Sequence, residues 1–179
     1  MRAVAILTLA ACLLSGCVSP RALRTPEDRQ VRLVVPFFPD DTDQCGPSAL
    51  ASVLGYWGKP STPGELRQEI YRAHLKGSLT VDLLLAAESR GLSAEMADGG
   101  LVQVKKELEE GHPVIAFVNV GLRVYPIGHY MVITGYDDGR QVLFAHSGMK
   151  RDKKISYGKF DKQWEKTRRW TLLILPAQS

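Results

Sequence analysis

Hydrophobic residues in the first third of the chain follow the spacing of an amphipathic helix. The apolar residues from Leu50 to Trp57 stand at i, i+3, i+4 and i+7, so they share one helix face. Pro47 suits the opening of this helix and Gly58 suits its end. Capping patterns and glycine stops predict three more helices, the second of them capped by Thr80. These three are expected at residues 62–76, 81–90 and 101–110.

Apolar residues in the second half come in nearly unbroken runs, which are typical of strands buried on both faces. Such runs occur at residues 114–118, 130–134 and 171–175. A hairpin turn is expected at 137–140 before a strand at 142–145, and an edge strand interrupted by Pro36 at 31–38. Helices followed by strands predict an α+β domain over residues 31–179, in which a helical layer packs on an antiparallel sheet.

The first residues have the pattern of an export signal. Arg2 is followed by an apolar run from Ala3 to Leu14, and small residues then lead to Cys17. The run is too short for a stable membrane span, so residues 1–16 are predicted to be a secretory signal. The ending Leu-Ser-Gly-Cys resembles the bacterial lipobox, which implies a lipidated Cys17 and a tether over residues 17–30. We expect an exported lipoprotein of the cell envelope, at the outer membrane and facing the periplasm.

Charge and composition limit the kinds of partner that the protein is expected to bind. The net charge is +4, and no basic run with interleaved aromatics indicates a nucleic-acid groove. The histidines lack ligand spacing and no second cysteine is available in the mature chain, so no metal site and no cofactor is expected. The expected partners are a peptide or protein substrate and, through the lipid, the membrane, with the domain itself monomeric.

One cysteine remains free in the mature chain. Of the three cysteines, Cys12 leaves with the signal and Cys17 would carry lipid, which leaves Cys45 without an intramolecular partner. Cys45 lies where the first helix begins, and unpaired N–H groups there stabilise a thiolate. The position therefore predicts a reactive thiol with a pKa below the ordinary value of about 8.5.

A nucleophilic thiol needs a base, and four histidines are available. His74 is expected inside a helix and His112 in a turn. His129 starts a strand expected to be buried, so its ring projects from the rim of the sheet, and His146 ends the next strand. His129 is the natural partner for Cys45.

Two segments carry a family resemblance: DQCGPSALASVLGYWG at residues 43–58 and GHYMVITGYDDG at 128–139. Together they resemble the papain-like cysteine peptidases of the double-glycine, bacteriocin-leader type, and more closely their exported lipoprotein relatives. The resemblance extends over nearly the whole mature chain, from VVPFFP to KFDKQWEKTRRWTLLILP. It implies a papain-like fold with Cys45 as nucleophile and His129 as general base across a cleft.

The chain departs from that family pattern at the oxyanion position. The family's glutamine lies five or six residues before the cysteine, where this chain has Pro39 and Asp40. An ionised Asp40 would repel an oxyanion, and the nearby amide is Gln44, directly before Cys45. Either residue is a candidate oxyanion group, with a loop role as the alternative for both.

A second departure concerns the group that orients the histidine. The family's aspartate is replaced by the segment around His146 and Ser147. With Asp138-Gly139 as the turn, Met131 would pair with His146, and His146 would lie on the same sheet face as His129. If the strand pairing slipped by one residue, Ser147 would lie on that face instead. Neither side chain supplies the negative charge that stabilises an imidazolium.

The sequence leaves three functions open. The leading one is a lipid-anchored cysteine peptidase acting in the envelope. The second is a pseudo-peptidase that binds a peptide or partner without cutting it, which the two departures would permit. A thiol acyltransferase or amidase with the same residues is the third, since one fold hosts several chemistries.

Overall fold

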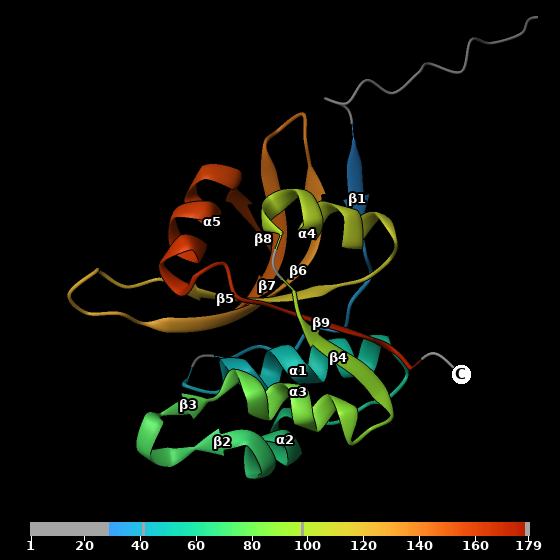
Figure 1. Ribbon diagram of the computed structural model, residues 1–179, viewed down its shortest axis with the longest axis vertical. Coiled ribbons are helices and arrows are strands. Elements are labelled where there is room, and N and C mark those ends of the chain that lie inside the picture. Colours follow the sequence, from blue (N-terminus) through green and yellow to red (C-terminus); the bar gives the residue numbers. More distant parts are fainter. Residues whose placement is uncertain (1–28, 41, 98, 178–179) are drawn as a thin grey trace, which may run out of the picture.

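The computed structural model describes residues 29–40, 42–97 and 99–177 (Figure 1). The expected signal at residues 1–16, Cys17 and nearly all of the expected tether at 17–30 lie outside the described residues. The α-helices are α1 (Cys45–Tyr56), α2 (Pro63–Ile70), α3 (Thr80–Glu88), α4 (Gly100–Glu109) and α5 (Tyr157–Trp164), with short 3₁₀ turns at Ala73–Leu75 and Glu165–Thr167. The strands are β1 (Gln30–Arg32), β2 (Tyr71–Arg72), β3 (Gly77–Ser78), β4 (Leu92–Met96), β5 (Val114–Asn119), β6 (Gly128–Asp137), β7 (Val142–Ser147), β8 (Lys150–Ser156) and β9 (Thr171–Pro176).

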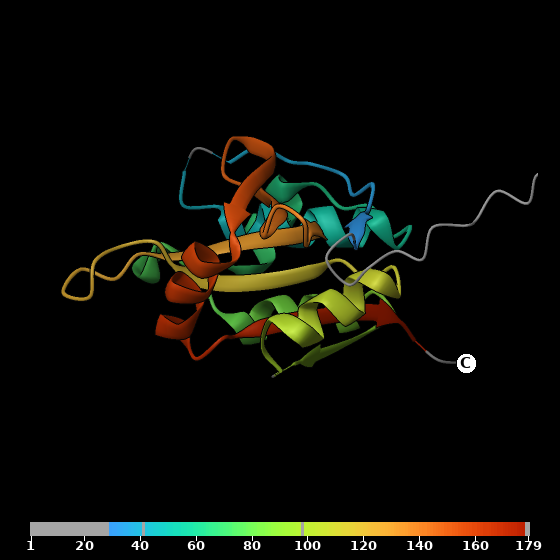
Figure 2. The same ribbon diagram turned by 90° about the horizontal axis from the view of Figure 1, so that it is seen from above.

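One seven-stranded antiparallel sheet organises the domain. Its order is β4-β9-β5-β6-β7-β8, and β1 pairs with β6 beyond the end of β5. Figures 1 and 2 show α1, α2 and α3 on one face of this sheet and α4 and α5 on the other. The α+β architecture with an antiparallel sheet is confirmed, and helices cover both faces.

Strand alternation divides the apolar residues into two cores. In β5, Ile115 packs toward α1, whereas Val114, Ala116 and Val118 pack toward α4 and α5. Because both faces are covered, every position of such a strand is apolar, which explains the unbroken runs in the sequence. The sheet is thus a middle layer that fixes the helices on either side.

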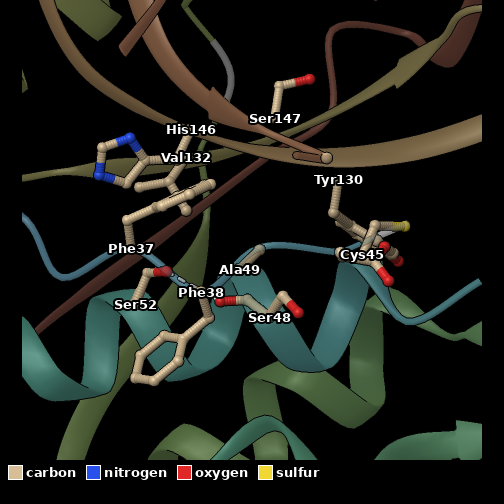
Figure 3. Close-up of a pocket in the computed structure, with 12 residues that line it drawn as sticks. Phe37, Phe38, Cys45, Ser48, Ala49, Ser52, Tyr130, Val132, His146 and Ser147 are labelled. Carbon is tan, nitrogen blue, oxygen red and sulfur yellow. Dashed lines mark hydrogen bonds between the residues drawn. The ribbon is translucent and has the colours of Figure 1, made fainter. Parts of the chain in front are cut away.

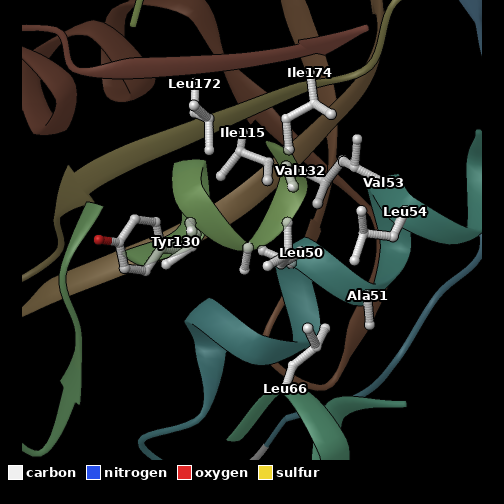
Figure 4. Packing of buried hydrophobic residues seen from close by; sticks show 14 of the residues in the cluster. Leu50, Ala51, Val53, Leu54, Leu66, Ile115, Tyr130, Val132, Leu172 and Ile174 are labelled. Carbon is white, nitrogen blue, oxygen red and sulfur yellow. The ribbon is translucent and has the colours of Figure 1, made fainter. Parts of the chain in front are cut away.

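The first core holds α1 in place, and Figure 4 shows how. Leu50, Val53 and Leu54 are fully buried, and they point at Val132 and Ile174 of the sheet. Each fully buried side chain of this size contributes about 1.5–3 kcal/mol relative to exposure. The helical stripe expected from the sequence is confirmed, and it fixes the N-terminus of α1 against the strands.

Several expected elements differ from the structure. The helix expected to run to Lys76 ends at Ile70, because Tyr71 is extended and Lys76 adopts a left-handed conformation with φ of 49°. The chain there forms the β2–β3 hairpin instead. Thr80 is not a cap; Leu79 is the N-cap of α3, with no side-chain cap hydrogen bond.

Other elements were not expected from the sequence. β4 and α5 lie in mixed polar segments without a clear period, and β8 begins with the charged stretch KRDKK at residues 150–154, which lacks the alternation typical of a strand. The strand expected at 31–38 is short, since only Gln30–Arg32 pairs with β6. Within the described ranges, each helix falls short of the length and apolarity that crossing a bilayer requires.

Candidate active site

α1 begins at Cys45 itself. Gln44 is its N-cap without a side-chain cap hydrogen bond, and the first helical bond joins the Ser48 N–H to the Gln44 carbonyl at 3.0 Å. The N–H groups of Cys45 and Gly46 therefore have no partner within the helix. A Cβ at Gly46 would lie 2.9 Å from the Cβ of Ser78, so only glycine lets β3 pack this closely against the helix start.

Burial raises the pKa of the Cys45 thiol more than any other influence. The backbone N–H groups of Tyr130, Gly46 and Cys45 lower this pKa, while the negative charge of Asp40 raises it, and the net shift is upward. The expected low pKa is therefore wrong, because the loss of water costs more than the helix N-terminus returns. Cys45 rests as a neutral thiol, with three N–H groups close to its sulfur.

His129 lies near the start of β6, opposite Val118. Its Nε2 is 2.9 Å from Oγ of Ser147, the last residue of β7. Burial lowers the pKa of His129 and the positive charge of Lys153 lowers it further, while Asp40 acts in the opposite direction. The ring is therefore neutral near pH 7 and able to accept a proton. Because Nε2 is engaged by Ser147, Nδ1 is the nitrogen left for other chemistry.

Cys45 and His129 are linked through Tyr130, near the start of β6. The Cys45 sulfur is close enough to the Tyr130 N–H for that group to lower the thiol pKa, and Tyr130 directly follows His129. The charge of Asp40 reaches both residues. No hydrogen bond joins the thiol to the imidazole, although both residues are within the described chain. Such contacts are often long without substrate and tighten when it binds.

His146 does not take the position expected of an orienting group. A bulge in β6 between Ile133 and Gly135 shifts the register, so His146 pairs with Val132 and not with Met131. The shift by one residue reverses which side chain faces His129. Ser147, the residue expected near His129 if the pairing slipped by one position, is the one that contacts the His129 ring.

The ring of His146 is fully occupied elsewhere. Its Nε2–H donates to the Val35 carbonyl at 3.1 Å, and its Nδ1 accepts from the Asp152 N–H at 3.3 Å. Phe37 packs against the ring edge-on, with centroids 5.1 Å apart. Burial lowers the pKa of His146, which suits this neutral form. The expectation that His146 orients His129 is wrong; His146 fastens the segment after β1 to the sheet.

Asp40 and Gln44 are joined through Thr42. Oδ1 of Asp40 accepts from the Thr42 N–H at 3.0 Å and from its hydroxyl at 2.8 Å, and Gln44 Nε2 donates to that hydroxyl at 3.2 Å. The Asp40 N–H also donates to the Gly148 carbonyl at 3.2 Å, which holds this loop at the end of β7. One N–H of the Gln44 amide is left over. The carboxylate of Asp40 is thus held by its own loop.

Two spaces lie beside these residues. A hollow of about 10 Å³, close to the room one water needs, separates Cys45 from β7; Figure 3 shows Tyr130 next to Cys45 and Ser147 at the strand end. A larger cleft of about 540 Å³ is lined by Gly128, which directly precedes His129, and by Phe117 and Trp170 among others. A Cβ at Gly128 would collide with the Phe117 ring. The larger cleft has the size of a ligand site.

Sequence reasoning missed two contributors. Tyr130 offers its backbone N–H to Cys45, and its ring packs on Phe117 with centroids 4.6 Å apart. Its place directly after His129 was the available signal. Lys153 lies in a charged stretch without a recognisable motif, yet its charge lowers the pKa of His129. Only the pairing of β7 with β8, which sets Lys153 opposite Ala145, brings it there.

One cluster resembles a set of metal ligands. Glu107, Glu110 and His112 each place a ligand atom within 4.8 Å of the others. His112 Nδ1 lies 2.8 Å from Glu107, which also accepts from Gln103, so these groups already satisfy one another. They form a bonded network near the end of α4 and take no part in the site at Cys45.

Comparison with known proteins gives consistent findings. Residues 29–172 match the model of the Peptidase_C39 like family. An uncharacterized protein of Methanothermobacter marburgensis is 36% identical over 107 residues, which cover 60% of this chain and 67% of that protein.

Solved structures share the fold. A double-glycine-motif protease from an AMS/PCAT transporter, in complex with a leader peptide, matches with TM-score 0.66 and 25% identity over 82% of this chain and 95% of that one. A putative C39-like peptidase from Bacillus anthracis matches with TM-score 0.67 and 18% identity, over 85% and 100% of the two chains. The peptidase domain of Streptococcus ComA matches with TM-score 0.63 and 21% identity, over 80% and 98%. The last two show the fold alone.

Proposed function

Because the chain belongs to the Peptidase_C39 like family and is thus a papain-like cysteine peptidase, we propose that Cys45 is its nucleophile and His129 its general base. The observation that supports this most is the group of N–H donors around the Cys45 sulfur at the start of β6, next to His129. A thiol, a neutral imidazole and preorganised donors are the parts that acyl transfer requires.

The proposed reaction starts from the neutral pair. Nδ1 of His129 takes the thiol proton while the sulfur of Cys45 attacks the carbonyl carbon of the substrate peptide bond, and the C=O electron pair moves to oxygen. Collapse of this intermediate expels the amine, which receives the proton from His129. Water then attacks the thioester, with His129 again as base, and releases the carboxylate product and the thiol.

The oxyanion in this proposal is held by backbone and amide donors. The Cys45 N–H has no helical partner, and one N–H of Gln44 remains free of Thr42. Asp40 cannot donate when ionised, and its Oδ1 is turned to Thr42. We therefore assign the oxyanion to Cys45 N–H and Gln44. One such donor contributes about 10²–10³-fold in rate.

Ser147 is proposed to orient the imidazole through Nε2. A hydroxyl carries no charge, so it fixes the ring without stabilising the imidazolium as a carboxylate would. Asp40 supplies part of that stabilisation from a distance, because its charge raises the pKa of His129. In this proposal Ser147 orients the ring and Asp40 acts only through its charge, which gives Asp40 a role other than oxyanion binding.

The substrate is proposed to be a peptide or protein segment bound in the cleft that Gly128, the residue before His129, helps to line. The cleft is concave and is lined by Phe117 and Trp170, as ligand sites commonly are by aromatic residues. The related transporter protease is solved with a leader peptide, which supports peptide binding in this family. The resemblance to a lipobox at Cys17 further supports an exported, lipid-anchored peptidase of the cell envelope, working as a monomer.

Acylation with an activated peptide ester tests the proposal on the full chain. A single acyl group on Cys45, found by mass spectrometry and absent from Cys45→Ala, is the expected result. Peptide binding, measured separately for both proteins, should survive in Cys45→Ala. An unacylated but alkylatable Cys45 in a chain that still binds peptide would overturn the proposal.

That last outcome corresponds to a second function, a peptide-binding module without catalysis. The specific observation in its favour is the neutral, unbonded resting pair of Cys45 and His129, together with a serine in place of the aspartate. Acylation of wild type decides between the two.

A further inference from the structure

The loop between β5 and β6, residues 120–127, extends away from the body of the domain (Figures 1 and 2). We call it the apolar finger. It exposes large apolar side chains in close succession: Val120 at 42%, Leu122 at 68%, Val124 at 75%, Tyr125 at 75% and Ile127 at 58%. Single exposed hydrophobic residues are ordinary, but a contiguous group of this kind marks an interaction site.

Hydrogen bonds hold the base of the apolar finger in a defined conformation. The side-chain oxygen of buried Asn119 accepts from the N–H groups of Gly121 at 2.9 Å and Ile127 at 3.0 Å, and the Val120 N–H donates to the Ile127 carbonyl at 2.9 Å. Lys166 fastens it from outside by donating to the Gly121 carbonyl at 3.1 Å. The finger is therefore held in a defined shape with its apolar side chains outward.

Cations lie within the apolar finger and in the segment that fastens it. Arg123 lies within the finger, and Lys162, Lys166 and Arg168 follow from α5 onward, all of them exposed. None of the four forms an ion pair with any residue of the described ranges. Asp161 and Glu165 are the acids nearest to them in sequence, and Asp161 is paired with Arg169, so the surface keeps a net positive charge.

We propose that the apolar finger inserts into the interface of an anionic phospholipid bilayer, with these cations on the lipid headgroups. A projecting tip suits a flat interface, whereas a peptide suits the concave cleft already assigned to it. Leu122 and Val124 are apolar and suit the boundary between headgroups and acyl chains, and Tyr125 suits the headgroup level where aromatic residues gather. Arg123, Lys162, Lys166 and Arg168 match a negative surface potential.

This docking goes beyond the proposed peptidase function and requires neither catalysis nor a lipid on Cys17. The docking would set the position of the cleft relative to the membrane. Gly128 and His129 follow the finger directly, and Pro126 and Gly128 both line the larger cleft. Insertion would therefore bring the cleft close to the bilayer, where it favours substrate segments that lie near a membrane surface.

Fluorescence quenching on vesicles tests the docking with the full chain. Leu122→Trp reports from the finger, and Val102→Trp is the matched control, since Val102 is 81% exposed on α4. The three native tryptophans give the background. With vesicles of brominated phosphatidylcholine and phosphatidylglycerol, the added fluorescence at 122 should be quenched several-fold more than at 102. Vesicles without phosphatidylglycerol, or Lys166→Glu, should weaken the difference.

Equal quenching at positions 122 and 102 would overturn the docking, as would equal quenching with and without phosphatidylglycerol. A probe at 122 that lipid does not quench but a bound peptide shields would assign the finger to the substrate cleft instead, which also overturns it. Because acylation of Cys45 is measured separately, failure here leaves the peptidase proposal intact.

Discussion

Cys45 and His129 reach the same end of the molecule from two regions that are held in different ways. Cys45 is fixed by a continuous helix whose apolar stripe fills the first core. His129 and Ser147 lie at the ends of two strands, where their own hydrogen bond and the anchoring of nearby loops hold them. The nucleophile side is therefore stabilised mainly by packing and the histidine side by a few directed bonds. Single substitutions should separate the two.

Loss of His146 should have a large effect on stability. His146→Leu leaves the Val35 carbonyl and the Asp152 N–H without partners, and each orphaned group costs about 1–3 kcal/mol. We expect about 2–4 kcal/mol of destabilisation in urea unfolding, with near-normal acylation of Cys45 per folded molecule. His74→Leu, at an exposed position, should change stability little. Normal stability in His146→Leu would contradict the structural role.

Gly46→Ala should disturb the nucleophile side. The new Cβ would lie 2.9 Å from the Ser78 side chain, and overpacking of this kind costs about 1–3 kcal/mol. Acylation should slow as well, because the start of α1 must shift. Gly64→Ala is the control within another helix, where the nearest outside atom is 4.0 Å away. Equal stability of the two variants would remove the close approach of β3 as a constraint.

Ser147→Ala should reduce acylation about tenfold, equivalent to about 1.4 kcal/mol, through the loss of one hydrogen bond to the ring. Stability should hardly change. Ser147→Thr retains the hydroxyl and should restore much of the rate, while Ser93→Ala on exposed β4 is a neutral control. An unaltered rate in Ser147→Ala would mean that the bond does not orient His129.

Charge substitutions should move the acid side of the pH–rate profile by a smaller amount. The base works when His129 is neutral, so activity is lost as pH falls through its pKa. Asp40 raises that pKa and Lys153 lowers it. Asp40→Asn should therefore shift the acid limb to lower pH and Lys153→Gln to higher pH, with Lys154→Gln as control. Shifts of the same sign would show that the charges act by another route.

The sequence determined the nucleophile side well, since the stripe from Leu50 to Trp57 and the helix start at Cys45 are local features. Local sequence patterns gave wrong predictions where tertiary contacts decide the conformation. Tyr71 leaves the expected helix to pair with Ser78. The bulge at Ile133 exchanged Ser147 for His146 near the imidazole. Burial, which no local pattern reports, reversed the expected pKa shift of Cys45.

The central claim is that neutral His129 activates neutral Cys45, and the acylation rate of Cys45 in wild type and His129→Ala tests it across pH. At neutral pH the variant should be slower by about 10²–10⁴-fold, the usual contribution of a general base. At alkaline pH, where the thiolate forms without help, the two rates should converge. Equal rates at every pH would contradict the claim and leave Cys45 without a base.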